Sequence, residues 1–424
     1  MGKLKLHWQI LIAISLAIVI GSTINVNSQI AGVKLYDVFD FLGTLFLNGL
    51  KMLVVPLVLS SIICGISSIG GNNKLGRLGG KTLTFYILSS LLAILIGLLF
   101  VNLLTPGIID GKPAGDRLNL SSNDEISSKL EQVEGRGSED IATVFLRMVP
   151  ANIVHAAAEG QMLGLIFFGL LFGFYLSRLQ GRLQQTLSDF WQGIFEIMMS
   201  ITMLVMKFAP IGVFGLVAMT VAATGFDAFK PLMIFFITVV LALAVHTFAT
   251  LAIVLKVIGH VNPLRHYKAM APAMLTAFST ASSSGTLPIT MECVEKEAKV
   301  SNQVTSFVLP LGATVNMDGT ALYECVAAMF IAQAYGLELT FTTQFTIVLI
   351  ALLTSIGVAG IPAASLVAIA VILSAIGLPL EGIGMLLVTD RVLDMMRTAV
   401  NVFSDSCCAV VVAKSEGENQ VLSN

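Results

Sequence analysis

The sequence predicts an all-α integral membrane protein that crosses the bilayer several times. Of its 424 residues, 56% are hydrophobic and only 12% are charged, and its mean hydropathy is +0.88. A soluble domain usually has about 25% charged residues, so this chain has too little polar surface to dissolve as a globule. Apolar runs of roughly 20 residues, the length that spans a bilayer as a helix, recur along most of it.

The charge balance and the cysteines exclude several other classes of protein. A net charge of −2 and an isoelectric point near 6.2 argue against a nucleic-acid partner, because such proteins carry a basic stripe. The cysteines form no C-x-x-C pair and lie in or beside apolar runs, so we interpret them as core residues rather than disulfides or metal ligands. They are Cys64, Cys293, Cys325, Cys407 and Cys408.

Six apolar runs fill the first 260 residues, and each predicts a membrane-spanning helix. The first follows Lys3 and Lys5 and has no convincing cleavage site, so we interpret it as a span rather than a signal peptide. Several runs exceed the minimum length, which predicts tilted or bent helices. The expected spans are residues 7–25, 37–68, 82–104, 142–178, 188–222 and 228–258.

The connections between these spans predict the orientation of the chain. Positive residues follow every second span, whereas the long segment 105–141 has more Asp and Glu than Lys and Arg. Cytoplasmic loops are the ones enriched in Lys and Arg, so we expect a cytoplasmic N-terminus and an outward-facing 105–141. The positive residues are Lys74, Arg77 and Lys81, then Arg178 and Arg182, then Lys256, Arg265 and Lys268.

The last third of the chain contains two apolar segments that are interrupted in the middle. Residues 263–298 are broken by Ser282 to Gly285 and by Pro288, and residues 341–378 by Gly357, Gly360 and Pro362. Each is followed by a helix with polar residues inside it, at 302–333 and 382–414. Non-helical backbone at membrane depth is tolerated only where it is buried in protein or lines a wet cavity. Paired interruptions of this kind indicate the binding site of a transporter.

The arms of each interrupted segment have only about ten residues, too few to cross a bilayer. We therefore expect two re-entrant helical hairpins, the first entering from the cytoplasm and the second, one crossing later, from outside. Two units of hairpin plus helix with opposite orientation form an inverted repeat. The alternative is that each segment is a pair of ordinary kinked spans.

The final helix carries a stripe of polar side chains. Their spacing of 4, 3, 4 and 4 residues keeps all five on one helical face. A charge at mid-bilayer costs at least about 2.5 kcal/mol, so four charges on one face indicate a function, although a structural ion-pair network is the alternative. Arg391 lies off this face, and we expect it to reach the surface. The stripe is Asp390, Asp394, Arg397, Asn401 and Asp405.

The carboxylates outnumber the positive groups around this stripe. Together with Asp318, the four acids exceed Arg397 by three negative charges. Buried surplus carboxylates either protonate or bind cations. Nearby Ser, Thr and Asn side chains, and carbonyls freed by the broken helices, are the hard oxygen ligands that an alkali cation prefers. Transition metals are not expected, because no cluster of soft ligands is present.

Arg397 predicts an anionic solute. A guanidinium stays charged and offers a planar fork that fits a carboxylate. Asp394, one turn earlier, is placed to accept an ammonium group, and Asn401 with the loop amides of the first hairpin would bind a second carboxylate. These features together predict a site for an acidic amino acid.

Three motifs resemble the glutamate transporter family of dicarboxylate/amino acid:cation symporters, in a prokaryotic-type member. They are S-S-S-G-T-L-P at 282–288, N-M-D-G-T-A-L-Y at 316–323 and D-x-x-x-D-x-x-R-T-x-x-N-x-x-x-D at 390–405. The resemblance covers nearly the whole chain. It implies a homotrimer embedded in the lipids of the cell (inner) membrane, with eight transmembrane helices, two re-entrant hairpins and both termini in the cytoplasm.

The resemblance also implies two domains, of which one slides like an elevator against the other. The scaffold would comprise residues 1–70 and 142–222, and the loop 105–141 would be extracellular. The transport domain would comprise helix 3 (79–104), helix 6 (226–258), hairpin 1 (263–298), helix 7 (302–333), hairpin 2 (341–378) and helix 8 (382–414).

The resemblance assigns site residues by their match to the motifs. Substrate contacts fall on Ser283, Thr320, Asp394, Arg397, Thr398 and Asn401, with Gly360 and Ile361 in a gate that closes the site. About three sodium ions per cycle are implied. One sodium site has Asp405, Asn401, Gly312 and Asn316; a second has carbonyls of Thr314, Ser355, Ile356 and Val358; a third has Tyr86, Ser89, Ser90, Asn316 and Asp318.

Three positions bear on ion coupling. Glu324 matches the acid that carries a co-transported proton in animal members, and we hold proton co-transport through it as a hypothesis. Potassium-coupled members have Arg two residues after Asp394, where this chain has Met396. Sodium-only archaeal members have Arg before the hairpin serines, where this chain has Ala281. Potassium countertransport is therefore left open.

Other carriers, a channel and a pump are the alternatives to an acidic amino-acid symporter. A C4-dicarboxylate carrier needs no ammonium acceptor such as Asp394, and a neutral amino-acid carrier typically lacks Arg397. An anion channel of the same fold remains as an alternative. Residues 80–82 imitate a phosphate-binding loop, but Leu75 stands where its first Gly is required, so an ATP-driven pump is disfavoured. Glutamate and aspartate differ by one methylene, and the sequence does not separate them. We do not expect an enzyme.

Overall fold

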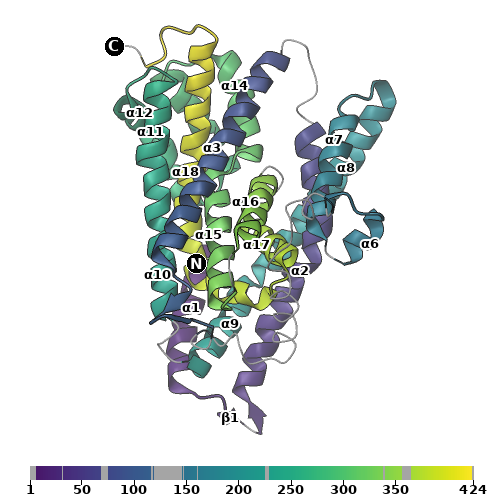
Figure 1. Ribbon diagram of the computed structural model, residues 1–424, viewed down its shortest axis with the longest axis vertical. Helices are drawn as coiled ribbons and strands as arrows, with labels where there is room; N and C mark the ends of the chain where they lie inside the picture. Colours follow the sequence, from purple (N-terminus) through teal and green to yellow (C-terminus); the bar gives the residue numbers. More distant parts are fainter. Residues whose placement is uncertain are drawn as a thin grey trace, which may run out of the picture.

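A computed structural model of the protein describes residues 6–30, 32–67, 75–115, 118, 146, 148–159, 161–224, 229–337, 340–355 and 364–422. Nearly all of this backbone is helical (Figure 1), so the predicted predominance of helix is confirmed. The described strands are short. β1 (Gln29–Ile30) pairs antiparallel with β2 (Val33–Lys34), and β3 (Ile108–Ile109) with β4 (Lys112–Pro113).

Helices from the first half of the chain form a first bundle. Helix α2 packs against α7, α8 and α9, and α1 packs along α9. The close approach of α2 and α9 depends on small residues, since a β-carbon at Gly212 would lie 2.3 Å from the Phe46 side chain. A short helix, α6 (Ile153–Ala158), is capped by the Asn152 side chain and packs on α7. The first bundle is α1 (Leu6–Thr23), α2 (Leu35–Ser67), α7 (Met162–Leu176), α8 (Gly181–Lys207) and α9 (Ala209–Thr224).

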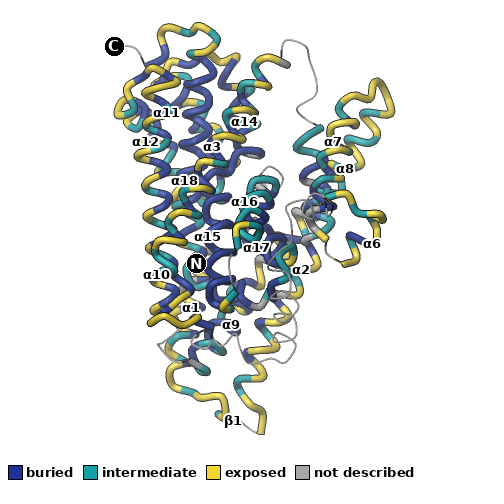
Figure 2. The backbone as a smooth tube through the Cα atoms, viewed as in Figure 1, coloured by how far each residue is buried: buried dark blue, intermediate teal, exposed yellow. Residues whose placement is uncertain are grey.

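The second bundle combines α3 with everything from α10 onward, and it contains the most buried helices. All of α15 except Thr320 is buried, and Figure 2 shows dark blue backbone through α15 and α18. Helix α3 lies against α15, where Gly97 approaches the Leu322 carbonyl. The second bundle is α3 (Leu75–Leu104), α10 (Phe229–Val245), η3 (His246–Thr250), α11 (Leu251–Val257), α12 (Pro263–Thr280), α13 (Ser283–Glu292), η4 (Cys293–Glu297), α14 (Asn302–Val315), α15 (Asp318–Ala334), α16 (Phe341–Ser355), α17 (Ala364–Ile376), η5 (Leu380–Gly382) and α18 (Ile383–Ser415).

The helices of the second bundle are broken near polar residues. Helix α12 ends at Ala281, whose φ of 49° and ψ of 42° are left-handed, and the Ser282 side chain caps α13 by accepting from the Gly285 amide at 3.1 Å. Helices α14 and α15 are separated by Asn316 and Met317. Both breaks free backbone groups beside buried side chains, which favours polar contacts there.

The last residues of the chain tie together the end of the second bundle where α3 and α14 begin. Glu416 bonds to Arg77 and, at 2.6 Å, to Lys81, both on α3. Farther on, the Leu422 amide donates to the Ala298 carbonyl at 3.0 Å. Val421 and Leu422 are buried, so this segment completes the packing of the bundle end.

The two bundles meet through α9, α16, α17 and α18. Helices α16 and α17 contact α7, α17 also contacts α2, and α18 contacts α9. In Figure 1 the first bundle's α7 and α8 lie to the right of the second bundle. Buried residues of both bundles form one continuous hydrophobic core, and a separate core lies wholly within the second bundle.

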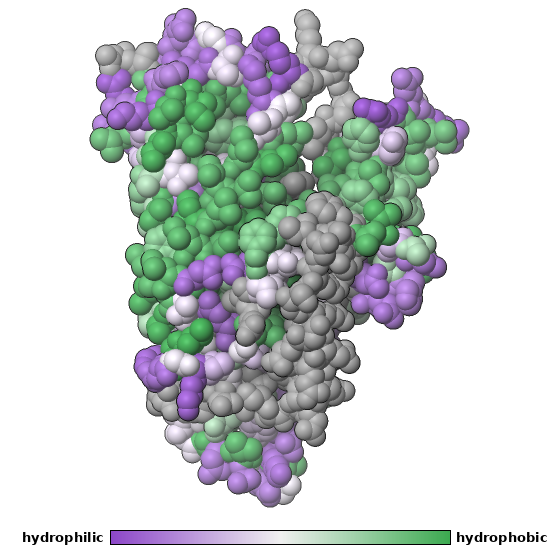
Figure 3. Space-filling model, in the orientation of Figure 1, coloured by the Kyte–Doolittle hydropathy of each residue, from purple (hydrophilic) through white to green (hydrophobic). Residues whose placement is uncertain are grey.

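The outer surface of the molecule suits a lipid environment. On α3, Leu92, Leu95, Leu99 and Leu103 are between 41% and 71% exposed, and Figure 3 shows a broad hydrophobic band with hydrophilic residues at its upper end. A soluble protein rarely exposes an apolar patch of this extent. Three described helices are long and apolar enough to cross a membrane unbroken, at Arg77–Leu104, Phe229–Val257 and Ile383–Ser415.

Other expected spans are divided between shorter helices in the described part of the chain. Helices α8 and α9 meet at a bend of 53° and would count as a fourth span if taken together. The expected span at 142–178 contains α6 and α7 with a break between them. The count of eight transmembrane helices therefore stays a prediction, whereas an apolar helical membrane protein is confirmed.

Candidate functional site

The polar stripe on α18 lies inside the second bundle. Arg397, Asn401 and Asp405 are 1%, 2% and 3% exposed, and α18 packs on α10, α12, α14 and α15. The sequence predicted that these side chains share one face, and the structure turns that face toward the breaks beside Ala281 and Asn316. The site therefore consists of α18 together with the broken ends of its neighbours.

At one end of the stripe, Arg397 forms two ion pairs. Its Nη2 donates to Asp394 Oδ1 at 2.9 Å and to Asp390 Oδ1 at 3.1 Å. The guanidinium carbon lies 3.9 Å from the centre of the Tyr323 ring, a cation–π contact that holds the group in place. Among the described residues, Arg397 Nε and Nη1 have no hydrogen-bond partner, so two donors remain available to a carboxylate.

Arg391 does not reach the surface, which corrects the expectation from its position. Its side chain is only 18% exposed and its Nη1 donates to Asp394 Oδ2 at 3.2 Å. An i, i+3 spacing brings the two side chains together on one side of the helix. The surplus of buried negative charge around the stripe is thus two rather than three.

Asp318 is the most enclosed carboxylate of the site. Its Oδ1 accepts from Ser90 Oγ at 2.7 Å and from Ser89 Oγ at 3.1 Å, both on α3. Its Oδ2 accepts from Ser404 Oγ at 2.6 Å and faces His246 Nε2 at 3.1 Å. The Asp318 and His246 side chains are both 0% exposed. As the first residue of α15, Asp318 also lies where a helix dipole favours negative charge.

Asp405 lies next to this cluster and shares a partner with it. Asn316 Nδ2 donates to Asp405 Oδ1 at 2.9 Å and to Ser404 Oγ at 3.2 Å. Because Ser404 also donates to Asp318, Asn316 and Ser404 together connect the two carboxylates. The backbone of Gly312 closes the other side, since a β-carbon there would lie 2.4 Å from Asp405 Oδ1 and 2.6 Å from the Tyr86 hydroxyl. Tyr86 itself donates to the Val308 carbonyl at 2.8 Å.

Asn401 connects the arginine end of the stripe to the carboxylate end. Its Oδ1 accepts from the Gly319 amide at 2.8 Å, and its Nδ2 donates to Thr320 Oγ1 at 3.1 Å. Ser283 is buried in the first turn of α13, and Thr398 Oγ1 donates to the Asp394 carbonyl of its own helix at 2.7 Å.

Glu324 lies one helical turn beyond Thr320 and is fully buried. Thr354 Oγ1 of α16 donates to Glu324 Oε2 at 3.0 Å. In the described part of the chain, the other oxygen, Oε1, has no hydrogen-bond partner. A buried carboxylate with a single neutral donor is poorly stabilised as an anion, so this arrangement suits a group that holds a proton.

Comparison with known proteins agrees with this geometry. The family model described as the sodium:dicarboxylate symporter family matches residues 6–415. The chain belongs to the sodium:dicarboxylate symporter family. It is therefore related to transporters and not to enzymes.

Three relatives within the symporter family illustrate the similarity. The proton/sodium-glutamate symport protein of Bacillus caldotenax is 36% identical over 418 residues, which cover 99% of this chain and 96% of the relative. The proton/glutamate-aspartate symporter of Escherichia coli (strain K12) is 37% identical, with 98% and 93% covered. Excitatory amino acid transporter 3 of Mus musculus is 33% identical, with 97% and 86% covered.

Part of the symporter site falls outside the described residues. Ile356, Val358, Gly360 and Ile361 all belong to the segment 356–363, which follows α16. Thr314 is the second-last residue of α14 and Ser355 the last of α16, and only their backbone is described. The expected second sodium site and the gate thus stay predictions.

Two residues that touch the buried carboxylates are not among those expected from the sequence. Ser404 bonds to Asp318 and Asn316, and His246 faces Asp318. The signal for His246 was present, since it interrupts the apolar run at 228–258. A lone polar residue inside a span usually faces the protein interior. Ser404 gave no separate signal, because a serine is common in membrane helices.

Proposed function

We propose that this member of the symporter family couples the uptake of an acidic amino acid to the entry of sodium. The observation that carries the proposal is the separation of two groups of polar side chains along α18 and the start of α15. Arg397 offers free donors at one end, and Asp318 and Asp405 form enclosed carboxylate clusters at the other. The bacterial relatives described above are proton/sodium-glutamate and proton/glutamate-aspartate symporters, which supports the same solute class here.

In this proposal the substrate binds at the arginine end. Its side-chain carboxylate would replace the Asp394 and Asp390 contacts of Arg397 or use the free Nε and Nη1 donors. Its ammonium would bind Asp394, with Thr320, Thr398 and Asn401 as polar neighbours. Ser283 and the amides at the start of α13 would bind the other carboxylate, since helix N-termini favour anions. Gly360 and Ile361 would then close the site.

The cations would bind at the carboxylate end. Sodium prefers oxygen ligands. Asp405 and Asn401 with the Gly312 and Asn316 carbonyls would provide one set, and Asp318 with Tyr86, Ser89, Ser90 and Asn316 would provide another. Each carboxylate is buried with a net negative charge, so cation binding removes an electrostatic cost. A third sodium would use carbonyls of Thr314, Ser355, Ile356 and Val358. Glu324 would carry a co-transported proton, and potassium coupling is left to experiment.

The larger-scale part of the proposal is a homotrimer in the cell membrane, with the second bundle moving against the first. The limited contact between the bundles, through α9 and α16–α18, supports relative motion. Both termini would lie in the cytoplasm, in accordance with the positive residues at alternate connections.

The test is uptake of labelled glutamate and aspartate into proteoliposomes of the full chain, with sodium, proton and potassium gradients imposed one at a time. We expect accumulation that requires inward sodium and is competed by unlabelled acidic amino acids. Succinate and alanine serve as controls for the sibling specificities. Accumulation of succinate or alanine in place of the acidic amino acids would contradict the substrate assignment, and uptake that only equilibrates would indicate a channel.

A further inference from the structure

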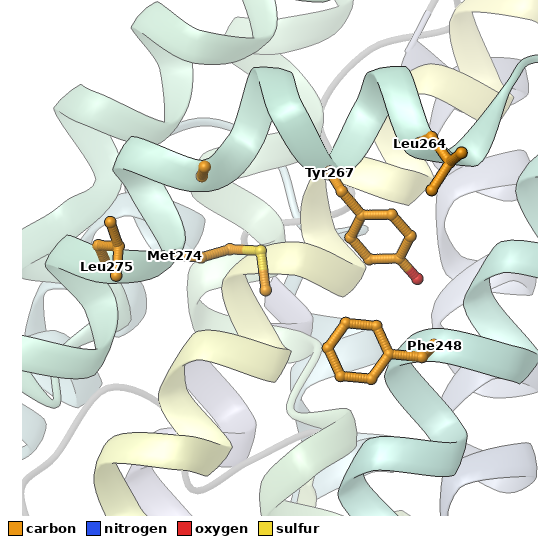
Figure 4. Close-up of a pocket in the computed structure, with 6 residues that line it drawn as sticks. Phe248, Leu264, Tyr267, Met274 and Leu275 are labelled. Atoms are coloured by element: carbon orange, nitrogen blue, oxygen red, sulfur yellow. The ribbon is translucent and has the colours of Figure 1, made fainter.

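An apolar groove of about 640 Å³ opens on the outer side of the second bundle, away from the polar stripe. It lies between η3 and α12. Figure 4 shows the rings of Phe248 and Tyr267 facing each other and the Met274 side chain extending beside them; the two ring centres are 5.6 Å apart. A volume of this size is typical of a ligand site, which usually has about 300–1,000 Å³. The lining residues are Phe248, Leu264, Tyr267, Ala271, Met274 and Leu275.

The chemistry of the groove requires an apolar occupant. The only polar side-chain group in the lining is the Tyr267 hydroxyl, which donates to the Thr247 carbonyl at 2.5 Å and is therefore satisfied. Phe248, Leu264 and Leu275 are 65%, 75% and 68% exposed. In a membrane protein, the apolar molecules that meet such a surface are lipid acyl chains.

Two lysines lie on the helices that form the walls of the groove. Its two walls run to the same end of the bundle, because the short connection 258–262 joins α11 to α12. Lys256 lies in the last turn of α11, and Lys268 adjoins Tyr267 in the second turn of α12. Both lysines are exposed, and neither forms an ion pair within the described part of the chain. Residues 230–291 contain no Asp or Glu at all.

The orientation of the chain gives this charge a partner. Lys256 and Lys268 belong to the connection after the sixth span, which the positive-inside rule assigns to the cytoplasm. The cytoplasmic leaflet contains the anionic lipids, and each Lys or Arg near its surface strengthens their binding. An apolar groove whose walls carry two exposed lysines is complementary to a lipid with an anionic headgroup.

We propose that this groove binds one anionic phospholipid. Its acyl chain would lie against Phe248, Tyr267 and Met274, and its phosphate would lie near Lys268, with Lys256 on the opposite wall. The proposal depends only on the membrane setting and on these side chains, and not on which solute the protein carries.

One side chain of the groove packs against α18 next to the buried carboxylates. The Tyr267 ring stacks on the Phe403 ring at 4.6 Å with an angle of 8° between the planes. Phe403 immediately precedes Ser404 and Asp405 on α18, and Thr247, which accepts from Tyr267, follows His246. An occupant of the groove would thus contact Tyr267, which in turn contacts residues adjacent in sequence to His246 and Ser404 of the Asp318 cluster.

The experiment uses the full chain in phosphatidylcholine vesicles with a trace of phosphatidylglycerol that carries a photoreactive group in its acyl chain. After illumination, peptide mapping by mass spectrometry finds the labelled residues. We expect label concentrated at Phe248 and at residues 264–275. Unlabelled phosphatidylglycerol should displace it at about thirtyfold lower concentration than phosphatidylcholine does, because each of the two lysines contributes about 1 kcal/mol, or about fivefold.

Two variants and a control complete the test. Ala271→Phe fills the groove and should remove the label there while leaving sparse label on α10 unchanged. Lys268→Gln should reduce the preference to about fivefold without filling the groove, because Lys256 remains. Arg182→Gln, an exposed charge at the start of α8 in the first bundle, should change neither. The proposal would be overturned by label spread evenly over the outer helices, by equal displacement with the two lipids, or by labelling that neither Ala271→Phe nor Lys268→Gln changes.

Discussion

Asp318→Asn removes one negative charge from the most enclosed carboxylate and keeps its shape. Three hydroxyls, on Ser89, Ser90 and Ser404, donate to this carboxylate, and hydroxyls can turn to accept from an amide. The loss of hydrogen bonding is therefore small, and the loss of charge dominates. Two unit charges about 4 Å apart interact by about 4 kcal/mol at an effective dielectric constant of 20, which is about a thousandfold in affinity.

Part of that amount is offset, because the neutral side chain is easier to bury and Asp405 remains. We therefore expect the sodium concentration for half-maximal uptake to rise between about tenfold and a thousandfold. The assay is sodium-dependent uptake of labelled glutamate or aspartate by proteoliposomes, with folding checked by size-exclusion chromatography. Asp110→Asn, an exposed carboxyl paired with Lys230, is the charge-matched control. A change below twofold in folded Asp318→Asn would refute the assignment of this cluster to sodium.

Three further predictions follow from the same contacts. In Glu324→Gln, uptake should persist but lose its response to a proton gradient. In the unmodified protein, one co-transported proton would add about 1.4 kcal/mol, or tenfold accumulation of the substrate, per pH unit. An unchanged response in the variant would exclude Glu324 as the proton carrier. Gly312→Ala forces a β-carbon against Asp405 Oδ1, so we expect about 1–3 kcal/mol of destabilisation and loss of sodium-dependent uptake. The control is Gly193→Ala, whose added β-carbon meets nothing within 4 Å; it should change neither stability nor uptake. The hydrogen bond from Lys81, and then the one from Arg77, lower the pKa of Glu416 from 4.5. The stability from these contacts is thus present above about pH 4.5 and lost as pH falls through the lowered pKa. Glu416→Gln should reduce thermal stability by at most about 1 kcal/mol at pH 7 and by less as the pH falls below 4.5, and a deficit that does not change with pH would contradict this origin.

The sequence predicts much of the fold because the bilayer imposes strict conditions on it. A spanning helix needs a long apolar run, and breaks are tolerated only where the backbone is protected. These rules locate the interruptions near Ser282 and Asn316, where the structure has the ends of α12 and α14. They do not predict the π-helical turn at His246 or the left-handed Ala281, because both depend on local packing rather than on hydropathy.

For the candidate site, helical periodicity predicts that Asp394, Arg397 and Asn401 share a face, since spacing alone determines the face. It does not predict partners on other helices. Ser404 on α18 and His246 on η3 reach Asp318 only because their helices pass beside the start of α15. Arg391 illustrates the opposite limit. Its position off the stripe indicated exposure, but a long side chain can turn back to a carboxylate three residues away.

The two ends of the stripe are mechanically linked through the first turn of α15. Asn401 bonds to both Gly319 and Thr320, and a β-carbon at Gly319 would lie 2.8 Å from the Arg397 carbonyl. Packed interiors deform little, so a cation that draws Asp318 or Asn316 inward shifts groups in contact with Arg397. Coupling between two binding sites is typically about 1–3 kcal/mol and is reciprocal. Sodium should therefore raise affinity for the acidic amino acid by the same factor as the amino acid raises affinity for sodium, and that shared factor is what makes transport of one depend on the other.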